Sequence, residues 1–303
     1  MLVKIMGSAA GGGFPQWNCG CVNCRRVRTG KFAGSPRTQA QLAWSFASRE
    51  WGLINASPDL RLQIEASPEL WPQEGTRNSP IRDVILLSAE LDQVLGLLLL
   101  REFHSFRVYA TPGVRKILTE DNSIFGVLAR FGGQVSWQDI APGLPFCAGG
   151  ACFEVLPLPG LFPGFVSAAR VRELNPADAV IGLIMSPEAG GKRLAFLPGV
   201  GSVSDDLLDR LQKCDAILFD GTFWSDDEPL SIRGISRTAR QMGHLPLSGK
   251  GGSLERMAGL QRQRKLFVHI NNTNPILDEE SREYRTIREA GWEVARDGME
   301  ITL

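Results

Sequence analysis

Residues 84–93 read Val84-Ile-Leu-Leu-Ser-Ala-Glu-Leu-Asp-Gln93, a short apolar run that ends in a polar cluster. A four-residue apolar run bounded by polar residues is typical of a buried strand. The stretch that follows, Leu91–Phe103, has a wide apolar face and predicts a buried helix. Acidic side chains therefore stand at a strand-to-helix junction, where α/β proteins often build a site at a sheet edge.

The same short apolar runs recur along the chain and predict further strands. We expect strands at Leu2–Met6, Leu42–Phe46, Gly52–Asn55, Val84–Leu87, Arg107–Ala110, Cys152–Leu156, Val180–Met185, Leu194–Leu197, Ala216–Phe219 and Leu266–Ile270. Two of them also lead into polar clusters, Asp220-Gly-Thr222 and His269-Ile-Asn-Asn272. Helices are predicted from the Ser204 N-cap to Lys213 and over Pro275–Ala290, where Gly291 is a C-terminal stop. Because we find no long linker and no repeat, we expect one domain over residues 1–303.

Charge and hydropathy limit the class of protein. The 303 residues hold 33 Lys and Arg against 33 Asp and Glu, so net charge gives no reason to expect nucleic acid or an anionic membrane as partner. The longest apolar run, Leu95–Leu100, is far short of the ~20 residues of a membrane span. Met1–Gly7 reads as a first strand and not as a signal peptide. We therefore expect a cytoplasmic protein without a membrane span.

The cysteines divide into a cluster and three scattered residues. Cys19-Gly-Cys21-Val-Asn-Cys24 places three thiolates within reach of one zinc ion, and the alternative is three unligated thiols. The upstream glycines of Gly7–Pro15 lack the spacing of a dinucleotide fingerprint; they allow either a tight turn or a close approach to a ligand. Cys147, Cys152 and Cys214 are expected to be buried free thiols.

The histidines are few. The chain has three, His104, His244 and His269, which excludes a hydrolase with a fully histidine-ligated zinc pair, since that needs about five. Read singly, Asp92 and Asp220 fit helix or turn caps and His269 fits a structural histidine. Together, Asp92, Asp220 and His269 at three strand ends form the ligand set of a non-haem metal centre.

The order of these segments resembles the metallo-β-lactamase superfamily, and within it the coenzyme PQQ (pyrroloquinoline quinone) biosynthesis protein B family. The resembling stretches are Gly7–Cys19, Asn55–Asp59, Gly96–Glu102, Asp220–Trp224, Met242–His244 and His269–Asp278. The resemblance implies an αββα sandwich, that is, two mixed sheets flanked by helices.

The resemblance also implies a role in making PQQ from a Glu–Tyr precursor. One reading is an iron-dependent hydroxylase of the tyrosine ring; the alternative is a soluble carrier that moves PQQ or its precursor toward the periplasm. A metal-dependent hydrolase is the least favoured, because histidines are missing. The partners would be this small molecule and other PQQ-biosynthesis proteins.

On the hydroxylase reading, Asp92, Asp220 and His269 hold catalytic Fe²⁺, and His244 acts as acid/base or binds substrate. A structural role for His244 stays open. Trp17, Trp224 and Arg233 are predicted to form walls around an aromatic, carboxylate-rich ligand.

Two departures from the superfamily pattern carry expectations. Many members of the family have Asp-His where this chain has Asp92-Gln93, and Leu158-Pro159-Gly160 stands where the superfamily has a later histidine. This sparse set suits Fe²⁺ or no catalytic metal. Related CxCxxC phosphodiesterases have His-x-x-His at the terminal strand end, where this chain has His269-Ile-Asn-Asn272. We therefore expect Asn272, or a water it holds, to be the fourth ligand of a structural zinc.

Overall fold

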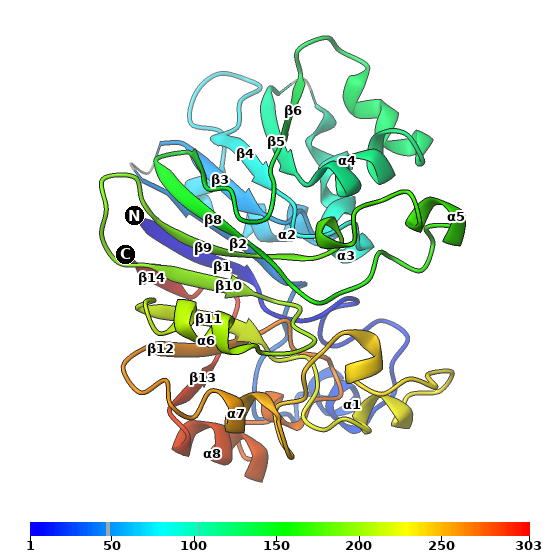
Figure 1. Cartoon of the computed structure of the whole chain (residues 1–303), viewed down its shortest axis with the longest axis vertical. Helices are drawn as coiled ribbons and strands as arrows, with labels where there is room; N and C mark the ends of the chain where they lie inside the picture. Colours follow the sequence, from blue (N-terminus) through cyan, green and yellow to red (C-terminus); the bar gives the residue numbers. More distant parts are fainter. Residues whose placement is uncertain (47–48, 103) are drawn as a thin grey trace.

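Two seven-stranded sheets are stacked face to face in the computed structural model, which describes residues 1–46, 49–102 and 104–303 (Figure 1). The first sheet contains, in spatial order, β14 (Glu300–Thr302), β1 (Leu2–Gly7), β2 (Gln41–Ser45), β3 (Trp51–Ile54), β4 (Ile81–Ile85), β5 (Phe106–Ala110) and β6 (Val135–Asp139). The second contains β13 (Trp292–Val294), β12 (Arg264–Val268), β11 (Ala216–Asp220), β10 (Leu194–Leu197), β9 (Ile181–Pro187), β8 (Ala151–Pro157) and β7 (Phe146–Ala148).

Both sheets are mixed. In the first, β14 to β3 pair antiparallel and β3 to β6 pair parallel. In the second, β10 to β13 pair parallel and β7 to β10 pair antiparallel. Parallel strands deliver their carboxyl ends to one edge of a sheet. The ends of β4, β11 and β12 are among them, so the polar clusters that follow these strands share one side of the molecule.

Helices cover the outer face of each sheet (Figure 1). The α-helices are α1 (Val22–Arg28), α2 (Leu60–Glu65), α3 (Leu91–Val94), α4 (Pro112–Thr119), α5 (Ala168–Val171), α6 (Asp205–Leu211), α7 (Ser253–Arg256) and α8 (Arg282–Glu289). The 3₁₀ turns are η1 (Pro68–Leu70), η2 (Leu95–Arg101), η3 (Ser123–Ala129), η4 (Pro176–Asp178), η5 (Glu228–Ser231), η6 (Arg240–Met242) and η7 (Pro275–Leu277). In Figure 1, α4 lies beside β5 of the first sheet, and α7 and α8 lie below β12 and β13 of the second.

The alternation of side chains along each strand produces the layers. In β4, Val84 packs outward with helical residues, whereas Ile85 packs between the sheets. In β11, Ile217 packs outward with α6, whereas Leu218 faces the space between the sheets. Both faces of these strands are buried, which explains why they read as continuous apolar runs. The αββα architecture expected from the sequence is confirmed.

The predicted helices are found with shorter or altered bounds. Leu91–Phe103 is a short α-helix, α3, followed by the 3₁₀ turn η2; its last residue, Phe103, lies outside the described residues. A Cβ on Gly96 would lie 2.3 Å from the Ser57 carbonyl oxygen, so the segment lies directly against a neighbouring loop.

The predicted helix over Pro275–Ala290 is split into η7 and α8. The side chain of Ser281 caps α8 by accepting a hydrogen bond from the Tyr284 amide, which starts a new helix there.

One cysteine prediction is wrong. Cys147 and Cys152 form a disulfide between the paired strands β7 and β8, where they stand opposite each other, instead of being buried free thiols. A sequence run with strand character does not reveal which residues face each other across a hairpin. Cys214 is a buried free thiol, as expected. None of the helices in the described part of the chain combines the length and apolar character needed to cross a membrane.

Candidate metal centre

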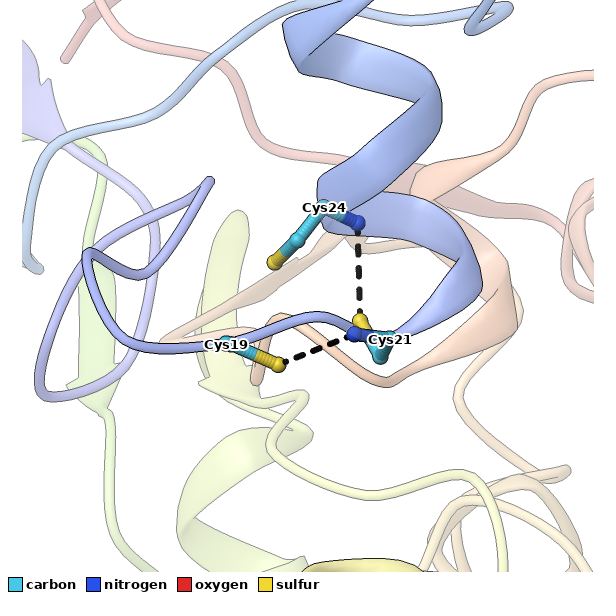
Figure 2. A group of neighbouring side chains, drawn as sticks. All are labelled: Cys19, Cys21 and Cys24. Carbon is cyan, nitrogen blue, oxygen red and sulfur yellow. Dashed lines mark hydrogen bonds between the residues drawn. The ribbon is translucent and has the colours of Figure 1, made fainter.

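The three clustered cysteines lie at the start of α1 and face one another (Figure 2). Their sulfur atoms lie within 4.8 Å of one another. Cys21 is the N-cap of α1, and its sulfur accepts a hydrogen bond from the Cys24 amide at 3.4 Å. The Cys21 amide in turn donates to the Cys19 sulfur at 3.4 Å. The turn into the helix therefore holds all three thiols around one point.

Asn272 closes this group from the second sheet. Its side-chain nitrogen lies 3.0 Å from the Cys19 sulfur, 3.6 Å from that of Cys21 and 3.4 Å from that of Cys24. A half-turn of the amide would present its oxygen to the same point. Three thiolates and one amide oxygen are a donor set that fits a closed, structural zinc site. The residue predicted as fourth ligand is thus adjacent to the other three.

A second cluster consists of Asp220, His244 and His269, whose ligand atoms lie within 4.8 Å of one another. Asp220 ends β11, and His269 follows the neighbouring parallel strand β12. His244 comes from the loop after η6. The two imidazole rings are stacked, with 5.4 Å between their centroids. Strand order therefore brings together two predicted ligands, and a loop adds a third donor.

Asp92, the remaining predicted ligand, joins this cluster from the other sheet. One of its carboxylate oxygens lies 3.3 Å from Nε2 of His269. The glycine-rich loop after β1 lies against it, since a Cβ on Gly11 would be 3.4 Å from that same oxygen. The loop hydrogen bonds to the end of β12, where the Ala10 amide donates to the Ile270 carbonyl. The 3.4 Å distance at Gly11 is an ordinary contact, whereas Gly12 and Gly13 have positive φ angles of 92° and 69°, so the glycines serve a tight turn, one of the two alternatives left open by the sequence.

Thr222 contacts three members of the cluster through its hydroxyl, and the sequence predicted no role for it. Its hydroxyl lies 2.5 Å from an Asp220 oxygen, 3.1 Å from His244 Nδ1 and 2.9 Å from His269 Nδ1. Because both histidines engage Thr222 through Nδ1, the rings are oriented by it. Its place in Asp220-Gly-Thr222, directly after a predicted strand, was the available signal.

Asp220 is fully buried, and its oxygens have several partners. One oxygen lies 2.7 Å from His244 Nδ1 and accepts from the Val200 amide at 2.8 Å; the other accepts from Thr222. Burial opposes ionisation, but His244 and His269 outweigh it and lower the pKa of the Asp220 carboxyl. Burial disfavours the charged form of His244, but the negative charge of Asp220 has the larger effect and raises the pKa of the imidazole. The carboxylate thereby fixes which nitrogen of His244 carries a proton.

A cavity of about 720 Å³ opens beside this cluster. Polar residues in its lining include Glu90, Asp92, Gln93, Thr222, His244 and His269. Its apolar walls include Leu161, Phe162, Phe165, Phe223 and Met242. A volume of this size accommodates a small organic molecule.

Gln93 provides a test of whether these residues fit a bound group. The residue is buried and lines the cavity, and its side-chain oxygen has no hydrogen-bond partner among the described residues. A buried acceptor without a donor is costly, so such an atom indicates a missing partner. With carboxylate oxygens and imidazoles beside it, the donor set fits a divalent first-row metal.

The three predicted walls do not line this cavity. Trp17 is 85% exposed near the cysteine cluster, Trp224 packs partly buried against the second sheet, and Arg233 lies in an exposed part of the loop after η5. The aromatic walls come instead from residues 159–165, and the cation is Arg237. No local pattern in the sequence marks these loop residues.

Comparisons with known proteins show the family to which the chain belongs. Residues 50–270 match the family model described as Beta-lactamase superfamily domain. The chain is 42% identical over 304 residues to coenzyme PQQ synthesis protein B of Methylorubrum extorquens and 43% identical over 307 residues to that of Azotobacter vinelandii, with 100% of each chain covered.

Comparison with solved structures indicates the same family and fold. The crystal structure of Zn²⁺-bound PqqB from Methylobacterium extorquens superposes with a TM-score of 0.93 at 41% identity and 100% coverage of both chains. A diphosphatase of the PhnP family superposes with a TM-score of 0.68 at 17% identity, covering 100% of this chain and 97% of the other, a likeness of fold alone.

Proposed function

Because this chain belongs to the coenzyme PQQ synthesis protein B family of the β-lactamase superfamily, we propose that it is a metal-dependent oxygenase of PQQ biosynthesis. Its substrate would be a Glu–Tyr-derived precursor, hydroxylated on the tyrosine ring. The observation that carries the proposal is the convergence of Asp92, Asp220, His244 and His269 beside a cavity of about 720 Å³.

These four residues are the ones that would hold the catalytic metal. When bound there, Fe²⁺ would supply the reactivity toward O₂ that ring hydroxylation needs. In the net reaction one oxygen atom of O₂ enters a ring C–H bond and the other leaves as water, with two electrons and two protons from an external reductant.

The protein's own groups position the substrate and control protons. Asp220 and Thr222 fix the rings of His244 and His269, so both imidazoles present a constant face to the cavity. His244 can hold a proton at Nδ1, where Asp220 accepts it in a hydrogen bond, which leaves Nε2 for the metal or the substrate. The apolar walls at Phe162 and Phe165 would pack against the aromatic ring of the substrate.

The test is oxygen uptake by protein purified without oxygen, after metal analysis, with the Glu–Tyr dipeptide and ascorbate as reductant. We expect uptake that is lost in His269→Ala. His104→Ala is the matched control, because His104 lies against the Ile81 carbonyl and outside the lining of this cavity. Tight binding of PQQ without any uptake would contradict the oxygenase and support a carrier.

Gln93→His offers a second variant of the same site. It restores the imidazole that many family members have at this position and replaces the unpartnered amide oxygen. We expect the variant to bind divalent metal more tightly than the wild-type protein, because imidazole is a better ligand than a neutral amide for these ions.

A further inference from the structure

The cavity beside the metal centre contains one strong cation. Among its described lining residues, Arg237 is the only lysine or arginine. The described residues give its guanidinium no hydrogen bond and no ion pair within 4 Å. Glu90 is near enough for the two charges to interact, but the five N–H donors of the guanidinium stay available to a ligand.

The backbone holds Arg237 close to the metal centre. Two residues further on, buried Ala239 donates its amide to the Asp226 carbonyl at 2.9 Å, and its own carbonyl accepts from the His244 amide at 2.9 Å. The loop that carries Arg237 is therefore tied to the histidine that contacts Asp220. These bonds fix the backbone beside Arg237, and its exposed side chain lines the cavity from there.

The other walls of the cavity are apolar or acidic, and this restricts which kind of ligand fits. Leu161 and Phe165 line the cavity although 71% and 47% of their surfaces are exposed, so a ligand's apolar part would cover them. Glu90 and Asp92 are also in the lining and repel a carboxylate, and among the described lining residues Arg237, whose charge acts on Glu90, is the cation that offsets them. A ligand with an apolar ring and a carboxylate at one end fits this distribution.

We propose that Arg237 binds a carboxylate of the aromatic substrate and thereby fixes which end of the molecule faces Asp92, His244 and His269. The inference rests on the proposed function, because it names the group by which that site selects its substrate. Arginine suits the task since its planar guanidinium pairs with a carboxylate through two parallel hydrogen bonds.

The experiment measures the Kd of the L-Glu-L-Tyr dipeptide and of PQQ, by calorimetry on anaerobic, iron-loaded protein. We expect Arg237→Gln to weaken both by about tenfold, which corresponds to the loss of one charge-assisted pair. The Kd values of Arg237→Lys should lie between those of the wild-type protein and Arg237→Gln, because lysine keeps the charge but cannot form two parallel hydrogen bonds. Arg233→Gln, four positions earlier and outside the lining of the cavity, should change Kd less than twofold.

A second comparison identifies the carboxylate. Two analogues each lack one carboxylate: the C-terminal amide of Glu-Tyr lacks the terminal one, and Gln-Tyr lacks the side-chain one. The wild-type protein should bind one of the two about tenfold more weakly than Glu-Tyr, which identifies the carboxylate that Arg237 binds. Arg237→Gln should bind that analogue and Glu-Tyr with the same Kd.

Unchanged Kd values in Arg237→Gln would overturn this inference and leave the proposed function intact. Arg237-dependent binding without oxygen uptake would contradict the oxygenase and support carboxylate recognition. A wild-type protein that binds neither probe would overturn both.

Discussion

Asn272 and His269 lie three residues apart on the segment after β12, yet they face different clusters. Asn272→Ala should weaken zinc binding at the cysteine cluster by roughly tenfold or more, as loss of a ligand or of its supporting hydrogen bonds does. Asn272→His should tighten it, because imidazole is a stronger zinc ligand than an amide. Competition with a chromophoric chelator measures both effects. Equal affinity in the alanine variant, or a structure with a histidine or fourth cysteine on this zinc, would refute the assignment.

Glu228 connects the two loops that flank the sites. Its carboxylate accepts from the Trp224 amide at 2.6 Å and from the Thr273 hydroxyl at 2.5 Å. Burial raises its pKa from 4.5 to about 7, against these hydrogen bonds. Since the folded state binds this proton more tightly than the unfolded state, the side chain lowers stability as pH rises from about 5 to 7.

Glu228→Gln should remove that pH dependence. Relative to wild type, the variant should gain about 1–2 kcal/mol in unfolding free energy between pH 5 and pH 8. Denaturant unfolding at both pH values measures the difference. Asp227→Asn is the control: this neighbour is exposed and its hydrogen bond to Ser225 lowers its pKa, so it does not titrate in this range. A constant difference between Glu228→Gln and wild type across the range would contradict the prediction.

Among the elements, α1 is a short helix whose position depends on contacts with other segments of the chain. Asn23 donates its side-chain amide to the carbonyls of Asn272 and Asn274, each at 3.2 Å. Arg26 forms an ion pair with Asp278. A helix of seven residues is marginal by itself, so its position depends on these contacts and on the cysteine cluster.

Cys21→Ser should therefore release about one zinc per chain and lower stability by several kcal/mol, since metal binding is coupled to folding. Elemental analysis and thermal unfolding measure the two effects. Val22→Ala, at the next and exposed position, should change neither. Full retention of zinc in Cys21→Ser would show that the cluster does not hold it.

The strands that the sequence predicts are the interior strands of the two sheets. Each of the ten expected runs contains or overlaps an observed strand. The unpredicted strands are β6, β7, β13 and β14, all at sheet edges. β7, β13 and β14 are three residues long, and β6 is largely accessible, so none shows a continuous apolar run. Edge strands are defined by a neighbour's hydrogen bonds, which no local pattern records.

In the site, too, local sequence patterns predicted the roles of residues at strand ends and missed those of residues in loops. Asp92, Asp220 and His269 could be predicted because each follows a strand, and strand ends meet at one edge. His244 was predicted only as an acid/base or structural residue, because it comes from a loop whose approach to Asp220 depends on tertiary packing. Arg237 and Phe162 lie in loops with no such signal.

On the scale of the whole molecule, the metal centre depends on how the two sheets are joined at one edge. Ala9 pairs with Gln39 on one side and with Ile270 on the other, and Ser88 pairs with Val180. Asp92 belongs to the first sheet's side of this edge and His269 to the second's. A relative shift of the sheets would therefore separate ligands that each sheet positions correctly by itself.

Arg37 and Asp297 stabilise this junction from inside. Arg37 is buried and donates to the Ser8 hydroxyl and the Ala295 carbonyl. Asp297 accepts from the Ser8 hydroxyl at 2.7 Å and from the Thr38 amide at 2.6 Å. Burial lowers the pKa of Arg37 to about 10, and the charge of Asp297 opposes that shift. The two charged side chains thus hold Ser8 at the start of the glycine-rich loop that reaches Asp92, and the Arg37 backbone pairs with Phe14 near its end.

Arg37→Met should cost about 3 kcal/mol in unfolding free energy, because it removes the hydrogen bonds of Arg37 to Ser8 and Ala295 and leaves half-buried Asp297 without that positive charge. Arg37→Met combined with Asp297→Asn should cost less than the sum of the single changes, by about 1 kcal/mol or more, since the charge of Asp297 is then removed as well. Denaturant unfolding of the four proteins measures the coupling. Arg37→Met should also lower the metal content of the Asp92 cluster, although it removes no ligand, because the loop against Asp92 loses its anchor. Strict additivity together with full metal content would mean that the junction does not depend on this pair and that the sheets are held in register by their shared core.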